Sequence, residues 1–238
     1  MSYSIGVLAG MGPRSTAPFV DMLVDASQSL YGAKYDMDFP KMHIISLPTP
    51  FYPGRAIDDI QMIQALEGGI ADLVRAEVDL IAVPCNLAHR YYSYMTQASA
   101  GIPVLHIADC ALTKISSDCK KIAIVGTEPT IDAEFYQERI YAAGKEPVLS
   151  IELRDRTTEL ITLIKEKGFD NNEVLKAWSS ILSCVEALKA DVLLIACTDI
   201  SPLIKNSVIN RPVKIVDTAL SLAEEAIHRF YQFKFTPK

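Results

Sequence analysis

The sequence predicts an α/β protein built from two similar halves, each a mainly parallel sheet flanked by helices. Three observations predict this fold class. Short apolar, β-branched runs alternate with amphipathic stretches along the chain, which is typical of parallel strands joined by helices. Several runs are continuously apolar, as expected for strands that are covered on both faces. A strand-and-turn motif and a cysteine motif each occur twice, at offsets of 116 and 112 residues.

The expected elements follow from these patterns. One amphipathic helix keeps its apolar face on Ile57, Ile60, Ile63, Ile70, Leu73 and Val74. Another keeps its apolar face on Val174, Leu175, Trp178, Ile181, Leu182, Val185 and Leu188. A last helix is expected over residues 218–233. The expected strands cover residues 5–9, 42–47, 80–84, 103–107, 122–126, 147–151, 192–196 and 214–217.

The repeated motifs define the expected domains. Residues 6–16 and 123–130 share a strand, a glycine, a proline and hydroxyl side chains in the same order. We therefore expect a first Rossmann-like domain over residues 1–107 plus 213–238, with the last helix returning to it, and a second over residues 108–212. Ligands of open α/β sheets bind beyond the carboxyl ends of the strands. Both repeated motifs fall there, which predicts an active site in the cleft between the domains.

Composition and charge exclude several classes of function. The 238 residues include 23 Lys and Arg against 29 Asp and Glu, giving a net charge of −6 and a pI near 5.3. This balance argues against nucleic-acid or anionic-membrane partners. No apolar stretch approaches the roughly 20 residues of a membrane span. The first residues lack the basic region of a signal peptide, so we expect a cytoplasmic protein.

The five cysteines do not indicate a disulfide scaffold, because their number is odd and the chain is large. No CxxC or HxxxH spacing indicates a metal site. Cys110 and Cys184 lie in amphipathic helical patterns and are expected to be buried. Cys119 lies in a polar stretch and is expected in a surface loop.

Cys85 and Cys197 are the candidates for chemistry. Each follows a buried-type strand where a helix should begin, and the pKa of a thiol falls at a helix N-terminus. Asn86 and Thr198, which follow them, could cap these helices and bind a carboxylate. Further donors for an anion are expected in the two turns after the first strand of each half, at Met11, Gly12, Thr127 and Thr130. One such cysteine is more often a core residue, but two at equivalent positions favour a small anionic ligand flanked by two sulfurs.

Other patterns leave alternatives open. Gly10-Met11-Gly12 resembles part of a dinucleotide fingerprint, but Ser15 stands where the third glycine should fall. His89 could orient a group beside Cys85 or only complete a polar helix start. Asp199 could meet a substrate ammonium, tune the thiol, or serve as a favourable charge in a first helical turn. His43 and His228 are expected to be structural.

At these residues the chain resembles the aspartate/glutamate racemase family, and the similarity runs along nearly its whole length. Residues 84–89 (PCNLAH) and 196–199 (ACTD) are similar to the family's PCNTAH and GCTE motifs. The opening strand with its Gly-Met-Gly-Pro turn, residues 36–40 (DMDFP) and residues 50–55 (PFYPGR) also resemble family segments. Together these motifs are specific.

The resemblance implies a homodimeric amino-acid racemase that needs neither pyridoxal phosphate nor metal. Its two-base mechanism would use Cys85 and Cys197 as the acid/base pair. Four residues would bind the α-carboxylate of a small anionic amino acid, namely Asn86, Thr198, Thr127 and Thr130. Arg55 and Lys167 match the residues that hold a side-chain carboxylate in aspartate racemases, although Lys165 is close enough to take the place of Lys167.

Three positions depart from the family pattern. Leu87 replaces a threonine, Gly54 replaces an aspartate, and Asp199 replaces a glutamate. Leu87 matters most, because it removes a hydroxyl beside the first thiol. Aspartate remains the first expected substrate because Arg55 is retained, with glutamate or another amino acid as alternatives. The competing functions are a maleate isomerase-like cysteine-pair isomerase and an inactive relative that binds small dicarboxylates.

Overall fold

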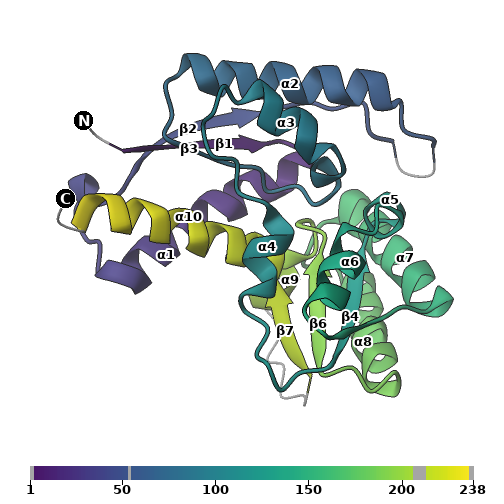
Figure 1. The fold of residues 1–238 in the computed structure, drawn as a ribbon. Helices are drawn as coiled ribbons and strands as arrows, with labels where there is room; N and C mark the ends of the chain where they lie inside the picture. Colours follow the sequence, from purple (N-terminus) through teal and green to yellow (C-terminus); the bar gives the residue numbers. More distant parts are fainter. Residues whose placement is uncertain (1–2, 53–54, 206–212, 236–238) are drawn as a thin grey trace. The chain divides into compact units, whose positions relative to one another are not determined.

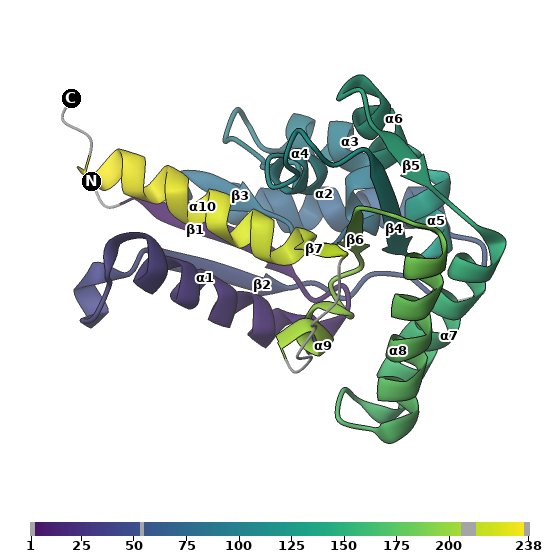
Figure 2. The same cartoon turned by 90° about the horizontal axis from the view of Figure 1, so that it is seen from below.

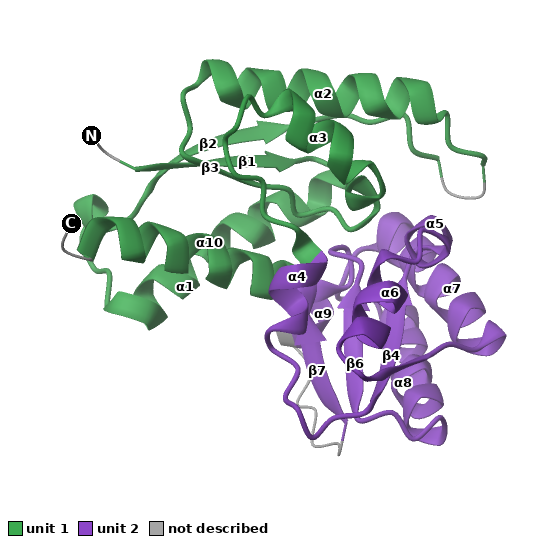
Figure 3. Ribbon diagram, in the orientation of Figure 1, with its two compact units in different colours: residues 1–107, 219–238 green, residues 108–218 purple. Residues whose placement is uncertain are grey.

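The computed structural model describes residues 3–52, 55–205 and 213–235, and this part of the chain forms two compact units (Figure 3). Unit 1 comprises residues 1–107 and 219–238, and unit 2 comprises residues 108–218. Each unit contains an all-parallel sheet with helices on both faces. The fold class predicted from the sequence is confirmed.

Unit 1 holds a three-stranded sheet in the order β2-β1-β3, formed by β1 (Ser4–Ala9), β2 (Lys41–Ser46) and β3 (Leu80–Ala82). The helices α1 (Thr16–Tyr31) and α10 (Thr218–Phe235) lie side by side on one face of this sheet (Figures 1 and 2). The helices α2 (Asp59–Arg75) and α3 (Tyr92–Ala98) cover the other face. Short 3-10 turns complete the unit: η1 (Pro13–Ser15), η2 (Asp36–Asp38) and η3 (Leu87–Tyr91).

Unit 2 holds a four-stranded sheet in the order β5-β4-β6-β7, formed by β4 (Lys121–Gly126), β5 (Glu146–Val148), β6 (Val192–Ala196) and β7 (Lys214–Asp217). Its helices are α4 (Ile107–Leu112), α5 (Glu128–Asp132), α6 (Phe135–Ala142), α7 (Ile151–Lys167), α8 (Asn172–Ala187) and α9 (Ser201–Lys205).

The side chains of β4 and β6 alternate between two cores. Ala123, Val125, Leu193 and Ile195 belong to the cluster that includes Trp178 and Leu160, from α8 and α7. Ile122, Ile124, Val192 and Leu194 belong to the cluster that includes Tyr136 and Ile140, from α6. Both faces of the central strands are therefore buried, which explains why these strands are continuously apolar in the sequence.

The two units repeat one topology. In each, the first strand pairs with the second on one side and the third on the other, giving β2-β1-β3 and β5-β4-β6. In unit 2 the third strand also pairs with β7. In unit 1 the corresponding neighbour of β3 is a single parallel bridge from Ile81 to Val104. The first three strands of the two sheets thus pair in the same order, in agreement with the repeated sequence motifs.

Three expected strands are shorter in the structure. Residues 80–84 form a strand only to Ala82, because the chain turns at Val83, whose carbonyl accepts from Cys85 N at 2.8 Å. Residues 103–107 form only the bridge at Val104, because Pro103 has no N–H to donate and Ile107 begins α4. Residues 147–151 form a strand only to Val148, because the Ser150 side chain accepts a hydrogen bond from Leu153 N at 3.0 Å and starts α7.

Three further expectations differ from the structure. The return to unit 1 was expected at residue 213, but β7 pairs with β6, so the chain leaves the sheet of unit 2 only after Asp217. Cys119 was expected in a surface loop, yet it is only 3% exposed and belongs to the core with Ile122. Ile60 was expected on the buried face of α2, but its side chain is 69% exposed in the first turn.

Within the described ranges, no helix has the length and apolar character needed to cross a membrane.

Candidate active site

The turn after β1 begins the first group of candidate residues, all in unit 1 and together called the first half-site: Met11, Gly12, Arg55, Cys85 and Asn86. Gly10 opens this turn with φ +94, and a Cβ on it would lie 2.4 Å from Leu47 N. Only glycine fits so close to the backbone of the neighbouring strand. Gly10 N donates to Thr16 Oγ1 at 3.1 Å, and Ser15 Oγ donates to Gly12 O at 2.8 Å. The turn that carries Met11 and Gly12 is therefore held at both ends.

Cys85 lies just past β3, at the carboxyl end of the sheet where the turn after β1 also lies. Its backbone N–H donates to Val83 O at 2.8 Å. His89 Nε2 lies 3.0 Å from the same oxygen, and a carbonyl can only accept, so His89 donates to it. The His89 side chain thus bonds back across the turn that holds Cys85.

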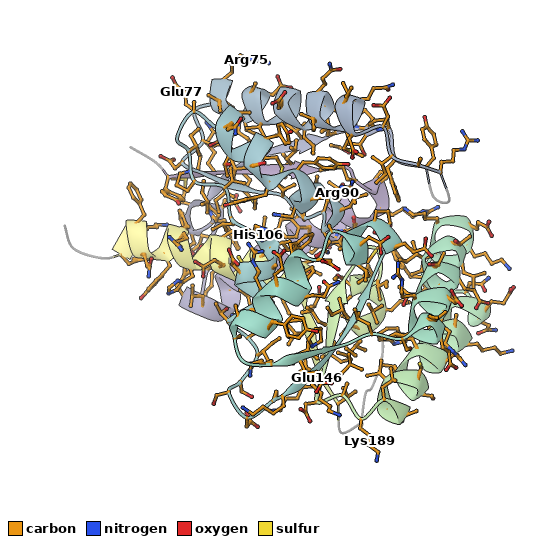
Figure 4. All side chains as sticks on the ribbon, turned by 45° about the vertical axis from the view of Figure 1, so that its right-hand side comes forward. Arg75, Glu77, Arg90, His106, Glu146 and Lys189 are labelled. Atoms are coloured by element: carbon orange, nitrogen blue, oxygen red, sulfur yellow. The ribbon has the colours of Figure 1, made fainter. Side chains whose placement is uncertain are left out.

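His89 belongs to a buried aromatic group. Its ring centroid lies 4.8 Å from that of His106, which is labelled in Figure 4, and His106 lies 4.5 Å from Tyr92. Tyr92 Oη donates to Val104 O at 2.7 Å. His106 was not among the residues predicted from the sequence. The signal that could have found it is its position directly after the run 103–105, at the same end of the sheet as Cys85.

A polar contact joins η3 to the start of α2. Tyr91 Oη donates to Asp59 Oδ1 at 2.5 Å, and Arg90, labelled in Figure 4, lies 3.6 Å from the same carboxylate. Burial raises the pKa of Tyr91, and the hydrogen bond to Asp59 raises it further. Arg55 lies in the loop before α2, where it is exposed and its guanidinium stands 5.4 Å from the centre of the Tyr52 ring. Gly54, the departure beside it, lies outside the described residues.

The environment of Cys85 is apolar. Cys85 is 8% exposed and Leu87 is 7% exposed, and both belong to one cluster with Met62 and Leu66. Met11 packs against this cluster, as do Leu47 and Phe51. Leu87 is thus a buried apolar neighbour of the Cys85 segment. Asn86, a residue only 3% exposed, stands at the N-cap position of η3 as expected, but its side chain makes no capping hydrogen bond there.

The second group of candidate residues, called the second half-site, lies at the carboxyl ends of β4 and β6 in unit 2: Thr127, Thr130, Cys197, Thr198 and Asp199. The hydroxyls of Thr127 and Thr130 lie 2.8 Å apart. Gly126 brings this segment against β6, because a Cβ there would lie 2.9 Å from Ala196 O. The threonine turn and the cysteine segment are therefore neighbours, as the sequence predicts.

Cys197, which is 7% exposed, begins a tight turn in which Ile200 N donates to Cys197 O at 3.0 Å. Thr198 and Asp199 stand in this turn and are also buried. The helix expected at Cys197 begins only at Ser201 and is five residues long. On the other half-site, Cys85 precedes a 3-10 turn. Full α-helix starts at the two thiols are thus not found, and the donors near them are turn amides and side chains.

The two candidate lysines have different partners. Lys165 Nζ donates to Asp199 Oδ2 at 2.8 Å, which brings the end of α7 to the turn after Cys197. Lys167 instead donates to Glu173 Oε1 at 2.6 Å, on the first turn of α8. Lys165 is therefore bonded to the second half-site, whereas Lys167 is bonded to α8. The sequence contained both residues, but the side of the helix on which each lies decides between them.

Comparison with known proteins identifies the family. The model of the Asp/Glu/Hydantoin racemase family matches residues 8–226, which include every candidate residue above. This chain belongs to that racemase family. Family membership makes it an amino-acid racemase of the class that acts without pyridoxal phosphate.

Individual relatives agree with this assignment. The chain is 36% identical over 231 residues to the broad specificity amino-acid racemase RacX of Bacillus subtilis, covering 97% of this chain and 99% of RacX. It shares its fold with Picrophilus torridus aspartate racemase, with TM-score 0.78, 22% identity, and coverage of 96% and 94% of the two chains. Francisella tularensis glutamate racemase, solved with D-glutamate, gives TM-score 0.72 and 16% identity, covering 100% of this chain and 85% of that one.

Proposed function

We propose that this racemase inverts the Cα of free amino acids with two cysteine thiols, Cys85 and Cys197. The observation that carries the proposal is their topological equivalence. Cys85 follows the third strand of one sheet and Cys197 follows the third strand of the other, and both sheets have the same strand order. A repeat of this kind supplies two matched acid/base groups, which inversion requires, since the proton must leave one face of the carbon and return to the other.

The proposed reaction balances as a proton exchange. One thiolate takes the Cα proton and becomes a thiol, and the electron pair passes into the α-carboxylate as an enediolate-like carbanion. The other thiol then gives its proton to the opposite face and becomes a thiolate. The reverse reaction starts from the opposite protonation states. Free enzyme must therefore hold one thiol and one thiolate for each direction.

Stabilisation of the carbanion is the second requirement, because an amino-acid Cα proton is very weakly acidic. Thr127 and Thr130, whose hydroxyls lie 2.8 Å apart, would donate to the α-carboxylate together with Thr198 and Asn86. The turn amides at Met11 and Gly12 would add further donors. The apolar cluster around Cys85 supports this chemistry, since a low-dielectric surrounding strengthens each contact to the developing charge.

Aspartate and glutamate are the first substrates to test. Arg55 would bind the side-chain carboxylate, and we assign the partner role to Lys165 because it is bonded to the turn after Cys197, whereas Lys167 is bonded to the first turn of α8. The proposal also includes a cytoplasmic location, as expected from the sequence, and a homodimer, as the family resemblance implies.

The test is α-proton exchange in D₂O with each enantiomer of aspartate, glutamate and a panel of neutral amino acids, without added cofactor. NMR follows loss of the α-proton and polarimetry follows inversion. The proposal predicts both for at least one amino acid. Formation of fumarate from maleate with no amino-acid exchange would instead assign a cysteine-pair isomerase. Saturable dicarboxylate binding with no turnover would assign an inactive relative.

A further inference from the structure

The ion pair between Lys165 and Asp199 joins the end of α7 to the turn after Cys197. Lys165 Nζ lies 2.8 Å from Asp199 Oδ2, and the Asp199 side chain is only 10% exposed while that of Lys165 is 34% exposed. Asp199 is thus the enclosed member of the pair. Because it stands two residues from Cys197, its charge acts on the same small region as the proposed acid/base group.

The ion pair changes the net charge that a substrate side chain meets at Lys165. A lysine that awaits a side-chain carboxylate presents a net positive charge, whereas the pair of Lys165 and Asp199 is neutral. An acidic substrate must draw Lys165 away from a carboxylate that is already bonded to it. It must also approach the negative charge of Asp199. A substrate with an uncharged side chain meets neither cost, because the pair remains intact.

The first half-site shows a matching feature on independent grounds. Leu87 stands where the resembled motif has a threonine, and it is 7% exposed in the same apolar cluster as Cys85. Met11 and Phe51 pack against that cluster. These neighbours offer no polar side-chain group to a substrate, and they favour contact with apolar atoms.

We propose that Asp199 is a specificity-determining residue: by holding Lys165 in a neutral ion pair, it opens the enzyme to amino acids with uncharged side chains and lowers its preference for acidic ones. This inference rests on the proposed racemase function and names the substrate class of the same site. Asp199 acts through Lys165 and takes no part in the proton transfers.

The experiment compares aspartate with asparagine, and glutamate with glutamine, because the members of each pair have nearly the same shape and differ in charge. The quantity measured is the ratio of kcat/KM for the acid to kcat/KM for its amide. Asp199→Asn removes one charge with almost no change of volume and releases Lys165. The ratio should rise by about tenfold, the size of a single charge-assisted contact.

Replacing the lysine of the pair should change this ratio in the opposite direction. Lys165→Met leaves the Asp199 carboxylate without its cation, so the ratio should fall by about tenfold. In the double variant both charges are gone, and the ratio should return towards that of the wild type, which measures their coupling. Lys176→Gln, which removes an exposed lysine of α8, is the matched control and should leave the ratio unchanged.

The outcomes separate this inference from the function on which it rests. A wild-type enzyme that exchanges the α-proton of no amino acid overturns the proposed function and the inference with it. An active enzyme whose ratio is the same in the wild type and Asp199→Asn overturns the inference alone. If Asp199→Asn does not fold, as judged by circular dichroism, the sign of the change in Lys165→Met decides, and an unchanged or increased ratio there also overturns it.

Discussion

Gly10→Ala should destabilise the protein far more than the same change at Gly32, although both glycines have positive φ. At Gly10 φ is +94 and a Cβ would lie 2.4 Å from Leu47 N and 2.7 Å from Ser46 C. Both atoms belong to backbone and cannot rotate away. At Gly32 φ is +72, and a Cβ would meet nothing within 4 Å. The pair of variants therefore separates a steric effect from a conformational one.

The magnitudes follow from these contacts. A positive φ costs an alanine about 1–2 kcal/mol, partly offset by the reduced entropy of the unfolded chain. Gly32→Ala should thus cost about 1 kcal/mol. Gly10→Ala must also push the backbone at Leu47 away, which threatens the hydrogen bond from Leu47 N to Ala9 O at 2.9 Å. Leaving those groups unsatisfied adds about 1–3 kcal/mol, for a total of about 2–5 kcal/mol.

Thermal unfolding followed by circular dichroism measures the difference. The two variants should differ by about 1–4 kcal/mol. At about 2–4 °C per kcal/mol for a chain of this size, the midpoint of Gly10→Ala should lie roughly 2–16 °C below that of Gly32→Ala. Racemisation should also fall in Gly10→Ala, because Met11 and Gly12 follow the displaced residue, and should persist in Gly32→Ala. Equal midpoints for the two variants would refute the argument that close backbone approach requires a glycine after β1.

Three further predictions concern the thiols, the histidine and the tyrosine. Cys85→Ser and Cys197→Ser should each lower kcat for racemisation by about 10²–10⁴-fold, which is the usual contribution of one acid/base group. The unfolding midpoint should change little. Near-wild-type turnover in either variant would show that its cysteine is not an acid/base group. His89→Ala should lower kcat with little change in KM, because Val83 O loses a donor and the Cys85 turn loosens. His89→Gln can donate to the same oxygen and should therefore keep much of the wild-type kcat. An equal loss of kcat in the two variants would contradict this role of His89. Burial raises the pKa of Tyr136, so the folded protein keeps a proton that the unfolded chain releases above pH about 10. Stability should therefore fall as pH rises beyond that value. In Tyr136→Phe the free energy of unfolding, measured by urea denaturation, should decrease less between pH 9 and pH 11 than in the wild type. An equal decrease in both proteins would contradict this prediction.

The sequence was sufficient for features that depend on local pattern. The runs at residues 192–196 and 214–217 are strands in the structure as predicted, because their apolar side chains face two cores. The repeated motifs correctly indicated two sheets of one topology. The strand expected at residues 103–107 was reduced to one bridge because a proline at its start limits pairing, a constraint that the apolar pattern alone does not express.

The contacts between side chains could not be predicted from the sequence. Lys165 and Lys167 both lie in the last turn of α7, and only the fold shows that one reaches Asp199 and the other Glu173. Likewise, the contact of His89 with Val83 O depends on how tightly the chain turns at Cys85. The polar residues around Cys119 suggested a loop, but its position before β4 buries the thiol. Such facts depend on long-range packing and on turn geometry, for which residue type is a weak guide.

The isotope content of the two enantiomers tests the two-thiol account most directly. In D₂O, L-aspartate or the best substrate of the panel is allowed to react to a few per cent conversion, and deuterium at Cα is measured by mass spectrometry in each separated enantiomer. The account predicts deuterium in the inverted product and none in the remaining substrate, because the thiol that delivers the proton is not the one that removed it. Deuterium appearing in both enantiomers at equal rates, or protium retained in the product, would indicate a single base and contradict the assignment of Cys85 and Cys197 as a pair.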